Sequence, residues 1–126
     1  MAQYTHLQLY RTSYNLLLEV MHVTKNFPRE FKYSLGEKIQ NAIVELLICI
    51  YKANSARDRA GFILQIIEYA QFLGVYFRIS FDLKIITEIK YTHFTQELAS
   101  VSKQAQGWLQ ASLKSAADDS QNAPQI

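Results

Sequence analysis

The segment GFILQIIEYAQFLGVYFRISFDL, residues 61–83, decides the fold class because it is apolar on nearly every side. Its only charged residues are Glu68, Arg78 and Asp82. Two apolar seams run beside each other at helical spacing: Phe62, Ile66, Tyr69, Leu73, Tyr76 and Leu83, with Ser80 at one step, and Ile63, Ile67, Ala70, Gly74, Phe77 and Phe81. A helix that is apolar all round is buried on more than one side. We therefore expect one seam to face the domain core and the second to face a neighbouring subunit, through Ile63, Ile67, Phe77 and Phe81.

The segment before residue 27 has a single seam of the same period. From about residue 4 to 26, apolar residues alternate at spacings of three and four, which predicts a helix: Leu7, Tyr10, Tyr14, Leu17 and Met21. Phe27-Pro28 ends it, because the residue before proline is disfavoured in the α-helical region. The sequence SLGE at residues 34–37 then has the form of a capping box, in which Ser34 and Glu37 satisfy each other's amides.

Three more helices follow from this start. The second spans about 35–53 and has, besides its core stripe, a separate apolar stripe of Val44, Leu47, Ile48 and Tyr51. The apolar segment belongs to the third helix, about 56–85. The fourth spans about 88–114, with Thr87 as its N-cap and a seam of Tyr91, Phe94, Leu98, Val101, Ala105, Trp108 and Ser112. Residues 118–126 have no apolar period, which predicts a disordered C-terminal tail.

The composition agrees with one all-helical domain. Apolar residues make up 49% and charged residues 19% of the 126-residue chain, which is typical of a globular protein. Four glycines and two prolines are too few for a many-turned β architecture. Four helices joined by short connections predict an all-α, up-down-up-down antiparallel four-helix bundle over residues 1–117.

Targeting and redox features indicate the cytoplasm. The N-terminus lacks a basic region leading into an apolar stretch, so no signal peptide is expected. No uninterrupted apolar run approaches the roughly 18 residues of a membrane span, so no membrane partner is expected. Cys49 is the single cysteine and cannot form an intrachain disulfide, which favours a reducing compartment.

No constellation of residues points to catalysis. His6, His22 and His93 lack the spacing of a helical zinc site. Cys49 lies in an apolar stretch, where a packed thiol is more common than a nucleophile. Glu-x-x-His pairs for a di-iron bundle and a phosphate-binding glycine loop are absent. We therefore expect no enzymatic activity, catalytic residue, metal, cofactor or small-molecule substrate.

Basic residues are the remaining candidates for a site. The formal net charge is only +2, which by itself does not indicate nucleic-acid binding. The densest positive cluster lies in KANSARDR, residues 52–59, where Lys52, Arg57 and Arg59 either contact phosphate or form a solvated loop that Asp58 partly neutralises. Phosphate contact gains weight if symmetry gathers several copies on one surface.

Three more basic residues are second choices for phosphate contact. Arg78 also has the spacing of an intrahelical ion pair with Asp82. Lys84 and Lys90 lie near the junction of the last two helices, where both are equally consistent with ordinary surface residues.

Several of these elements together resemble the bAvd-like four-helix-bundle proteins. The resemblance rests on Phe27-Pro28, KYSLGEKIQ at 32–40, YKAN at 51–54, Arg57, RISFDLK at 78–84 and GWL at 107–109, in this order. It extends over about residues 5–114. These proteins are accessory variability determinants of diversity-generating retroelements, and are kin to four-helix-bundle proteins encoded within intervening sequences of bacterial ribosomal RNA genes.

The resemblance implies a ring-like homo-oligomer, most simply a homopentamer, with a positive surface. It also implies that the protein binds a reverse transcriptase and its template RNA or DNA, and so supports mutagenic retrohoming without catalysing a reaction. A structural or protein-binding oligomer with no nucleic-acid role is the alternative.

Overall fold

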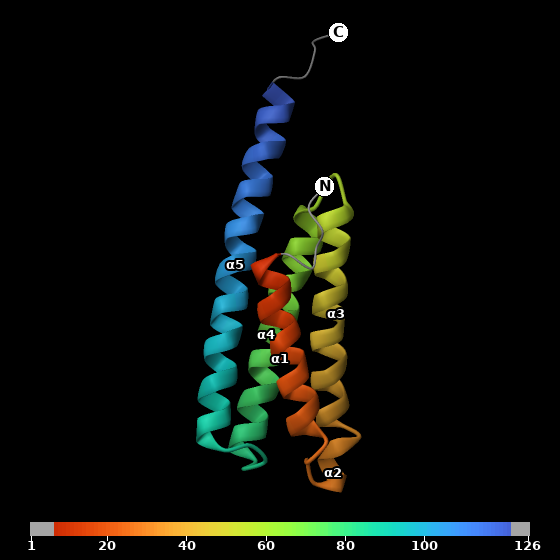
Figure 1. Cartoon of the computed structure of the whole chain (residues 1–126), viewed down its shortest axis with the longest axis vertical. Helices are drawn as coiled ribbons and strands as arrows, with labels where there is room; N and C mark the ends of the chain where they lie inside the picture. The colour runs from red at the N-terminus through yellow and green to blue at the C-terminus, as the bar shows by residue number, and fades with distance from the viewer. Residues whose placement is uncertain (1–6, 122–126) are drawn as a thin grey trace.

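The computed structural model describes residues 7–121, which form five helices and, within that range, no strand. The helices are α1 (Gln8–Thr24), α2 (Arg29–Lys32), α3 (Leu35–Ser55), α4 (Ala60–Asp82) and α5 (Glu88–Gln121). The four long helices pack in a cycle: α1 contacts α3 and α5, and α4 contacts the same two helices. Consecutive long helices join at alternate ends of the molecule, and α5 extends past the others (Figure 1). The chain is therefore an all-helical bundle.

The helix ends differ in places from the predicted ones. The backbone of Ala56 is extended, so α3 runs to Ser55 and α4 begins only at Ala60. Beyond the predicted end near 114, α5 continues to Gln121 through an alanine-containing stretch of high helix propensity. The first part of the predicted tail is therefore helical. Residues 1–6 and 122–126, which include the start of the first predicted helix and the rest of the tail, lie outside the described residues.

The two predicted N-caps have opposite outcomes. The Thr87 hydroxyl accepts a hydrogen bond from the Lys90 amide at 3.1 Å, which confirms Thr87 as the cap of α5. The capping box at Ser34 is wrong, because the Ser34 side chain makes no cap hydrogen bond. Its hydroxyl instead donates to the Glu30 carbonyl at 3.3 Å, because the short helix α2 places that carbonyl one turn earlier.

The core of α4 corrects the predicted subunit interface. Its buried residues are Ile63, Ile66, Ala70, Leu73, Phe77 and Ser80, a pattern that takes alternate members from both predicted seams. Ile63 is 0% exposed and Phe77 is 2% exposed, so neither is accessible to another subunit. Ile67 and Phe81 are half-buried against the same core. The four residues predicted as an interface therefore belong wholly or partly to the packing of the bundle itself.

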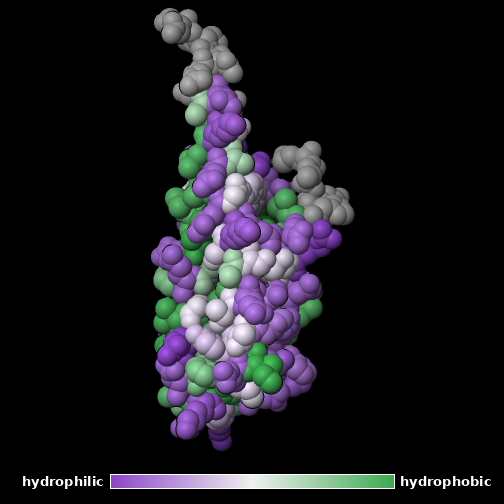
Figure 2. Space-filling model, turned by 90° about the vertical axis from the view of Figure 1, so that its left-hand side faces the viewer, coloured by the Kyte–Doolittle hydropathy of each residue, from purple (hydrophilic) through white to green (hydrophobic). Residues whose placement is uncertain are grey.

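A third row of α4 is the one that remains exposed. We call it the α4 stripe: Leu64, Phe72, Val75, Ile79 and Leu83. These residues recur at helical spacing on the side opposite the core residues. The outer face of α5 is mainly hydrophilic by comparison, as seen from its side of the molecule (Figure 2). The helix thus has two apolar sides as predicted, but the outward one consists of different residues.

The stripe also gives α4 the composition of a membrane span. By length and composition alone, α4 is apolar enough to cross a membrane, and it is the single such helix in the described part of the chain. The search of the sequence for an uninterrupted apolar run did not find α4, because the charged residues Glu68 and Arg78 interrupt this helix. One such helix is weak evidence, since core helices of bundles meet the same test, and α4 packs against both α3 and α5.

Polar side chains connect neighbouring helices at particular positions along the bundle axis. The Gln40 amide donates to the Thr24 hydroxyl at 2.7 Å, which links α3 to α1. The His93 Nε2 atom lies 2.6 Å from the Glu19 carboxylate, which links α5 to α1. Such partly buried contacts have geometric requirements that apolar packing lacks, so they fix how the helices are aligned along their axes.

Candidate functional site

The six predicted basic residues lie at two opposite ends of the bundle. Lys52, Arg57 and Arg59 flank or form the α3–α4 connection, whereas Arg78, Lys84 and Lys90 flank the α4–α5 connection (Figure 1). The helix between them separates the two groups by roughly 30 Å, at 1.5 Å per residue. One subunit therefore does not gather all six on a single surface.

The group at the α4–α5 end is partly neutralised. The Arg78 Nε atom donates to the Asp82 carboxylate at 3.1 Å, as one reading of the sequence predicted. Hydrogen bonds to Tyr91, the larger cause, and to Asp82 raise the pKa of Arg78. The guanidinium therefore already interacts with groups of its own subunit. Lys84 is exposed and has a positive φ of 60°, a conformation uncommon outside glycine that ends α4 sharply. The ion pair thus engages Arg78, whereas Lys84 and Lys90 are exposed.

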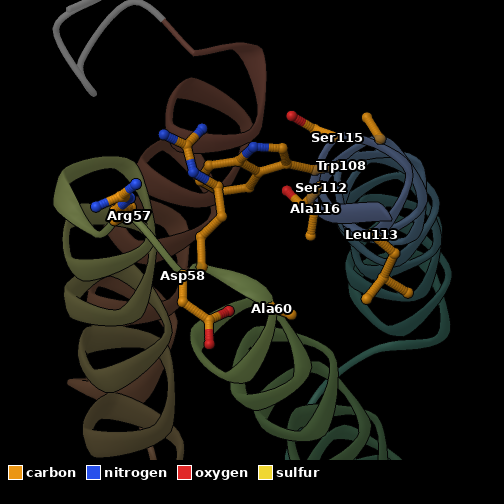
Figure 3. A pocket seen from close by; sticks show the side chains of 10 residues that line it. Arg57, Asp58, Ala60, Trp108, Ser112, Leu113, Ser115 and Ala116 are labelled. Carbon is orange, nitrogen blue, oxygen red and sulfur yellow. The ribbon is translucent and has the colours of Figure 1, made fainter. Parts of the chain in front are cut away.

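Two members of the group at the α3–α4 end, Arg57 and Arg59, line an open groove, whereas Lys52 does not. The groove has a volume of about 710 Å³ and lies between this connection and the projecting part of α5 (Figure 3). We call it the Arg–Trp groove; its lining residues are Arg57, Asp58, Arg59, Ala60, Trp108, Ala111, Ser112, Leu113, Ser115 and Ala116. The Arg59 guanidinium lies over the Trp108 ring, 5.9 Å from its centroid, within the range of a cation–π contact.

The acidic residue of the connection leaves these arginines unpaired. The Asp58 carboxylate is directed away from the Trp108 ring (Figure 3). Within residues 7–118, no carboxylate forms an ion pair with Arg57 or Arg59. Arg57 and Lys52 are exposed, and Arg59 is half-buried by its contact with Trp108. Asp58 therefore forms no ion pair with either arginine, although it lines the same groove and reduces the net charge there.

Trp108 is a member of this groove that the sequence-based site prediction missed. It belongs to the predicted seam of the last helix, of which Phe94, Leu98, Val101 and Ala105 are buried in the core. Trp108 and Ser112 are only half-buried. The reason is that α5 continues past the ends of α3 and α4 (Figure 1). The sequence contained only an indirect signal, because the predicted seam continued through Trp108 to Ser112 without showing which of its members the other helices would leave uncovered.

The single cysteine has the environment of a packed side chain. Cys49 is buried, and its thiol donates to the Gln65 side-chain oxygen at 3.3 Å across the α3–α4 contact. Burial raises the pKa of the Cys49 thiol above its usual range, so less thiolate is present at neutral pH.

We expect Cys49 to react slowly with a thiol-specific disulfide reagent near pH 7 in the native protein. Full reaction is expected once denaturant exposes the side chain, and the ratio of the two rates measures the protection. Fast, complete reaction without denaturant would contradict this assignment.

The described residues offer no metal centre. No three His, Cys, Asp or Glu side chains between residues 7 and 118 are grouped so as to hold an ion. His93 is engaged with Glu19, His22 is exposed, and His6 lies outside the described residues.

A further surface hollow lies between α1 and α3. This α1–α3 groove has a volume of about 380 Å³, and its lining residues are Tyr10, Leu17, Val44, Leu47, Ile48 and Tyr51. Four of them form the second stripe predicted for the α3 helix. The lining contains no formally charged side chain. The bundle therefore has two apolar surface features on different sides, the α4 stripe and the α1–α3 groove.

Comparison with known proteins agrees with the fold and with the resemblance. A search of curated proteins finds no match. Residues 7–112 match the family described as bAvd-like. The match begins one residue before α1 and ends in α5 beyond Trp108, so it includes α1, α3 and α4 in full, α5 up to Ser112, and most of the Arg–Trp groove. The chain therefore belongs to the bAvd-like family.

Proposed function

We propose that this protein is a non-catalytic accessory protein of a diversity-generating retroelement. In this role it binds the reverse transcriptase and its template RNA or DNA and supports mutagenic retrohoming. The observation that carries the proposal is the family match over residues 7–112. The unpaired arginines at the α3–α4 end supply a physical means of holding a polyanion. A free, buried Cys49 is consistent with the reducing cytoplasm.

Assembly into a ring of identical subunits is part of the same proposal, and the family resemblance implies that the ring is a pentamer. The α4 stripe of one subunit packs into the α1–α3 groove of the next, so that both apolar features are covered. An interface between two different patches is heterologous, and it generates a closed ring when the rotation between neighbours divides a full turn. The stripe thus contacts protein rather than lipid.

Ring symmetry supports nucleic-acid binding despite the small charge of each chain. The formal net charge is +2 per subunit. In a ring, the α3–α4 ends of all subunits lie on one rim, where each copy adds its Lys52, Arg57 and Arg59. Concentrated charge of one sign raises the local potential and attracts a phosphate backbone.

Salt dependence tests this charge directly. With Arg57 and Arg59 both replaced by Gln, log affinity for a labelled oligonucleotide is expected to depend less steeply on log salt. The slope changes by about 0.9 for each lost phosphate contact on duplex DNA and about 0.7 on a single strand. Fluorescence anisotropy over a range of salt concentrations measures this slope.

The matched control replaces Arg29 and Lys38, two exposed cations at the other end of the bundle, by Gln. It removes the same charge and is expected to keep the native slope. An equal change of slope in both double variants would show that only net charge matters.

A structural or protein-binding oligomer without a nucleic-acid role is the second candidate, and the exposed α4 stripe favours it. The two candidates differ at low salt. No binding of RNA or DNA even at about 50 mM salt, where phosphate contacts are strong, would select the second candidate. Co-purification of this protein with a reverse transcriptase encoded beside it would support the retroelement accessory function.

A further inference from the structure

We propose that the Arg–Trp groove binds single-stranded nucleic acid by stacking an unpaired base on Trp108. The inference rests on the nucleic-acid-binding function proposed above. It goes beyond that function because it states that the ligand is single-stranded and that Trp108 distinguishes it from a duplex. The notable feature is an aromatic ring and unpaired arginines in one open groove.

The groove has the two chemistries that a nucleotide needs. Its cationic part is formed by Arg57 and Arg59, which no carboxylate of residues 7–118 neutralises. Its flat, apolar part is the indole ring of Trp108, which comes from α5 (Figure 3). A phosphate matches the first part and a base matches the second. Stacking of bases on aromatic side chains beside a positive surface is the usual means of binding single strands without sequence preference.

The dimensions agree with a ligand of that size. A volume of about 710 Å³ lies within the 300–1,000 Å³ typical of small-ligand sites, and so accepts a nucleotide unit. The hydroxyls of Ser112 and Ser115 also line the groove and offer hydrogen bonds to the edge of a base or to a sugar. The groove opens at the end of the bundle, where a continuing strand can enter and leave (Figure 3).

Duplex DNA cannot use the indole ring in this way. Inside a duplex both faces of each base are covered by the neighbouring pairs, so that, apart from the two end pairs, only edges and phosphates are accessible. A duplex would therefore contact the arginines but not stack on Trp108. Arg59 already lies over one face of the indole, so a base stacks on the opposite face or displaces the guanidinium. The groove should prefer single strands for this physical reason.

The chain itself contains the probe for this experiment. Trp108 is the single tryptophan of the protein, so its fluorescence reports on the groove alone. The titration uses a single-stranded oligothymidylate of 12 nucleotides, a duplex of 12 base pairs, and polyglutamate of matched charge. We expect the single strand to quench Trp108 emission strongly, and the duplex and polyglutamate to leave it nearly unchanged.

A variant pair separates stacking from charge. Trp108→Leu is expected to weaken binding of the single strand roughly 5- to 150-fold and to leave duplex binding unchanged, which corresponds to the loss of one stacked base. Tyr33→Leu, at an exposed aromatic position on the other end of the bundle, is the matched control and should bind normally. If Trp108→Leu loses helicity, the quenching titration of the unaltered protein decides alone.

The other outcomes identify which proposal fails. Binding of the labelled single strand by anisotropy, without quenching and without loss in Trp108→Leu, would overturn the stacking site while nucleic-acid binding stands. Equal quenching by polyglutamate would assign the groove to an acidic protein segment instead. Absence of binding to either nucleic acid would overturn this inference and the proposed function together.

Discussion

Replacing Val75 and Ile79 by glutamate is expected to convert the protein from an oligomer to a monomer that keeps its helices. Val75 is 57% exposed and Ile79 is 40% exposed in the single subunit, so the new carboxylates cost little there. In the proposed interface the same carboxylates would be buried without partners, which is strongly unfavourable. Multi-angle light scattering measures the mass, and far-UV circular dichroism measures the helicity.

The matched control adds the same charge elsewhere. Gln96 and Gln106 are exposed residues on α5, and their replacement by glutamate should leave the oligomer unchanged. An unchanged mass for the Val75→Glu, Ile79→Glu variant would remove the α4 stripe from the interface. A native protein that is monomeric at micromolar concentration would refute self-assembly altogether.

Phe77→Ala is expected to lower the free energy of unfolding by about 3–5 kcal/mol, the range for removing a large aromatic side chain from a core. Phe77 is 2% exposed, and its ring centroid lies 4.9 Å from that of Phe94 on α5. The loss is a large part of the roughly 5–15 kcal/mol that stabilises a typical domain. Urea unfolding followed by circular dichroism gives the free-energy difference.

Val75→Ala, two residues away on the same helix, is the control because its side chain points outward. A change within about 0.5 kcal/mol is expected for it when native subunits are dissociated. All variants must be compared at one protein concentration, because assembly itself adds to apparent stability. A stable but monomeric Phe77→Ala protein would reverse the assignment and place Phe77 at the subunit interface.

The positions of the helices were largely predictable from the sequence because the signals are local. The seam from Leu7 to Met21 predicted that α1 is a helix, and Phe27-Pro28 stops it by backbone sterics. The face was wrong, because the buried row of α1 is Leu9, Ser13, Leu16, Val20 and Thr24. Thr87 caps α5 as predicted, since its hydroxyl needs only the amide three residues later. The Ser34 cap was wrong because α2, only one turn long, offers that hydroxyl a competing carbonyl.

The candidate site was predictable only in part. The basic residues could be named from the sequence, but their division between two ends of the bundle depends on where α4 begins and ends. The contact between Arg59 and Trp108 joins residues 49 positions apart, so no local pattern indicates it. Asp58 illustrates the same limit, because adjacency in sequence does not tell whether it forms an ion pair with either arginine, and in the structure it forms none.

By itself, the sequence determined that this chain is helical, that the third predicted helix has two apolar sides, and that it resembles the bAvd-like proteins. Only the tertiary structure decided which row of α4 is core. Three neighbouring rows are apolar, so periodicity could not rank them, and packing against both α3 and α5 selects the row between the two predicted seams. That selection buries Ile63 and Phe77, and it leaves Val75 and Ile79 on the surface for a partner.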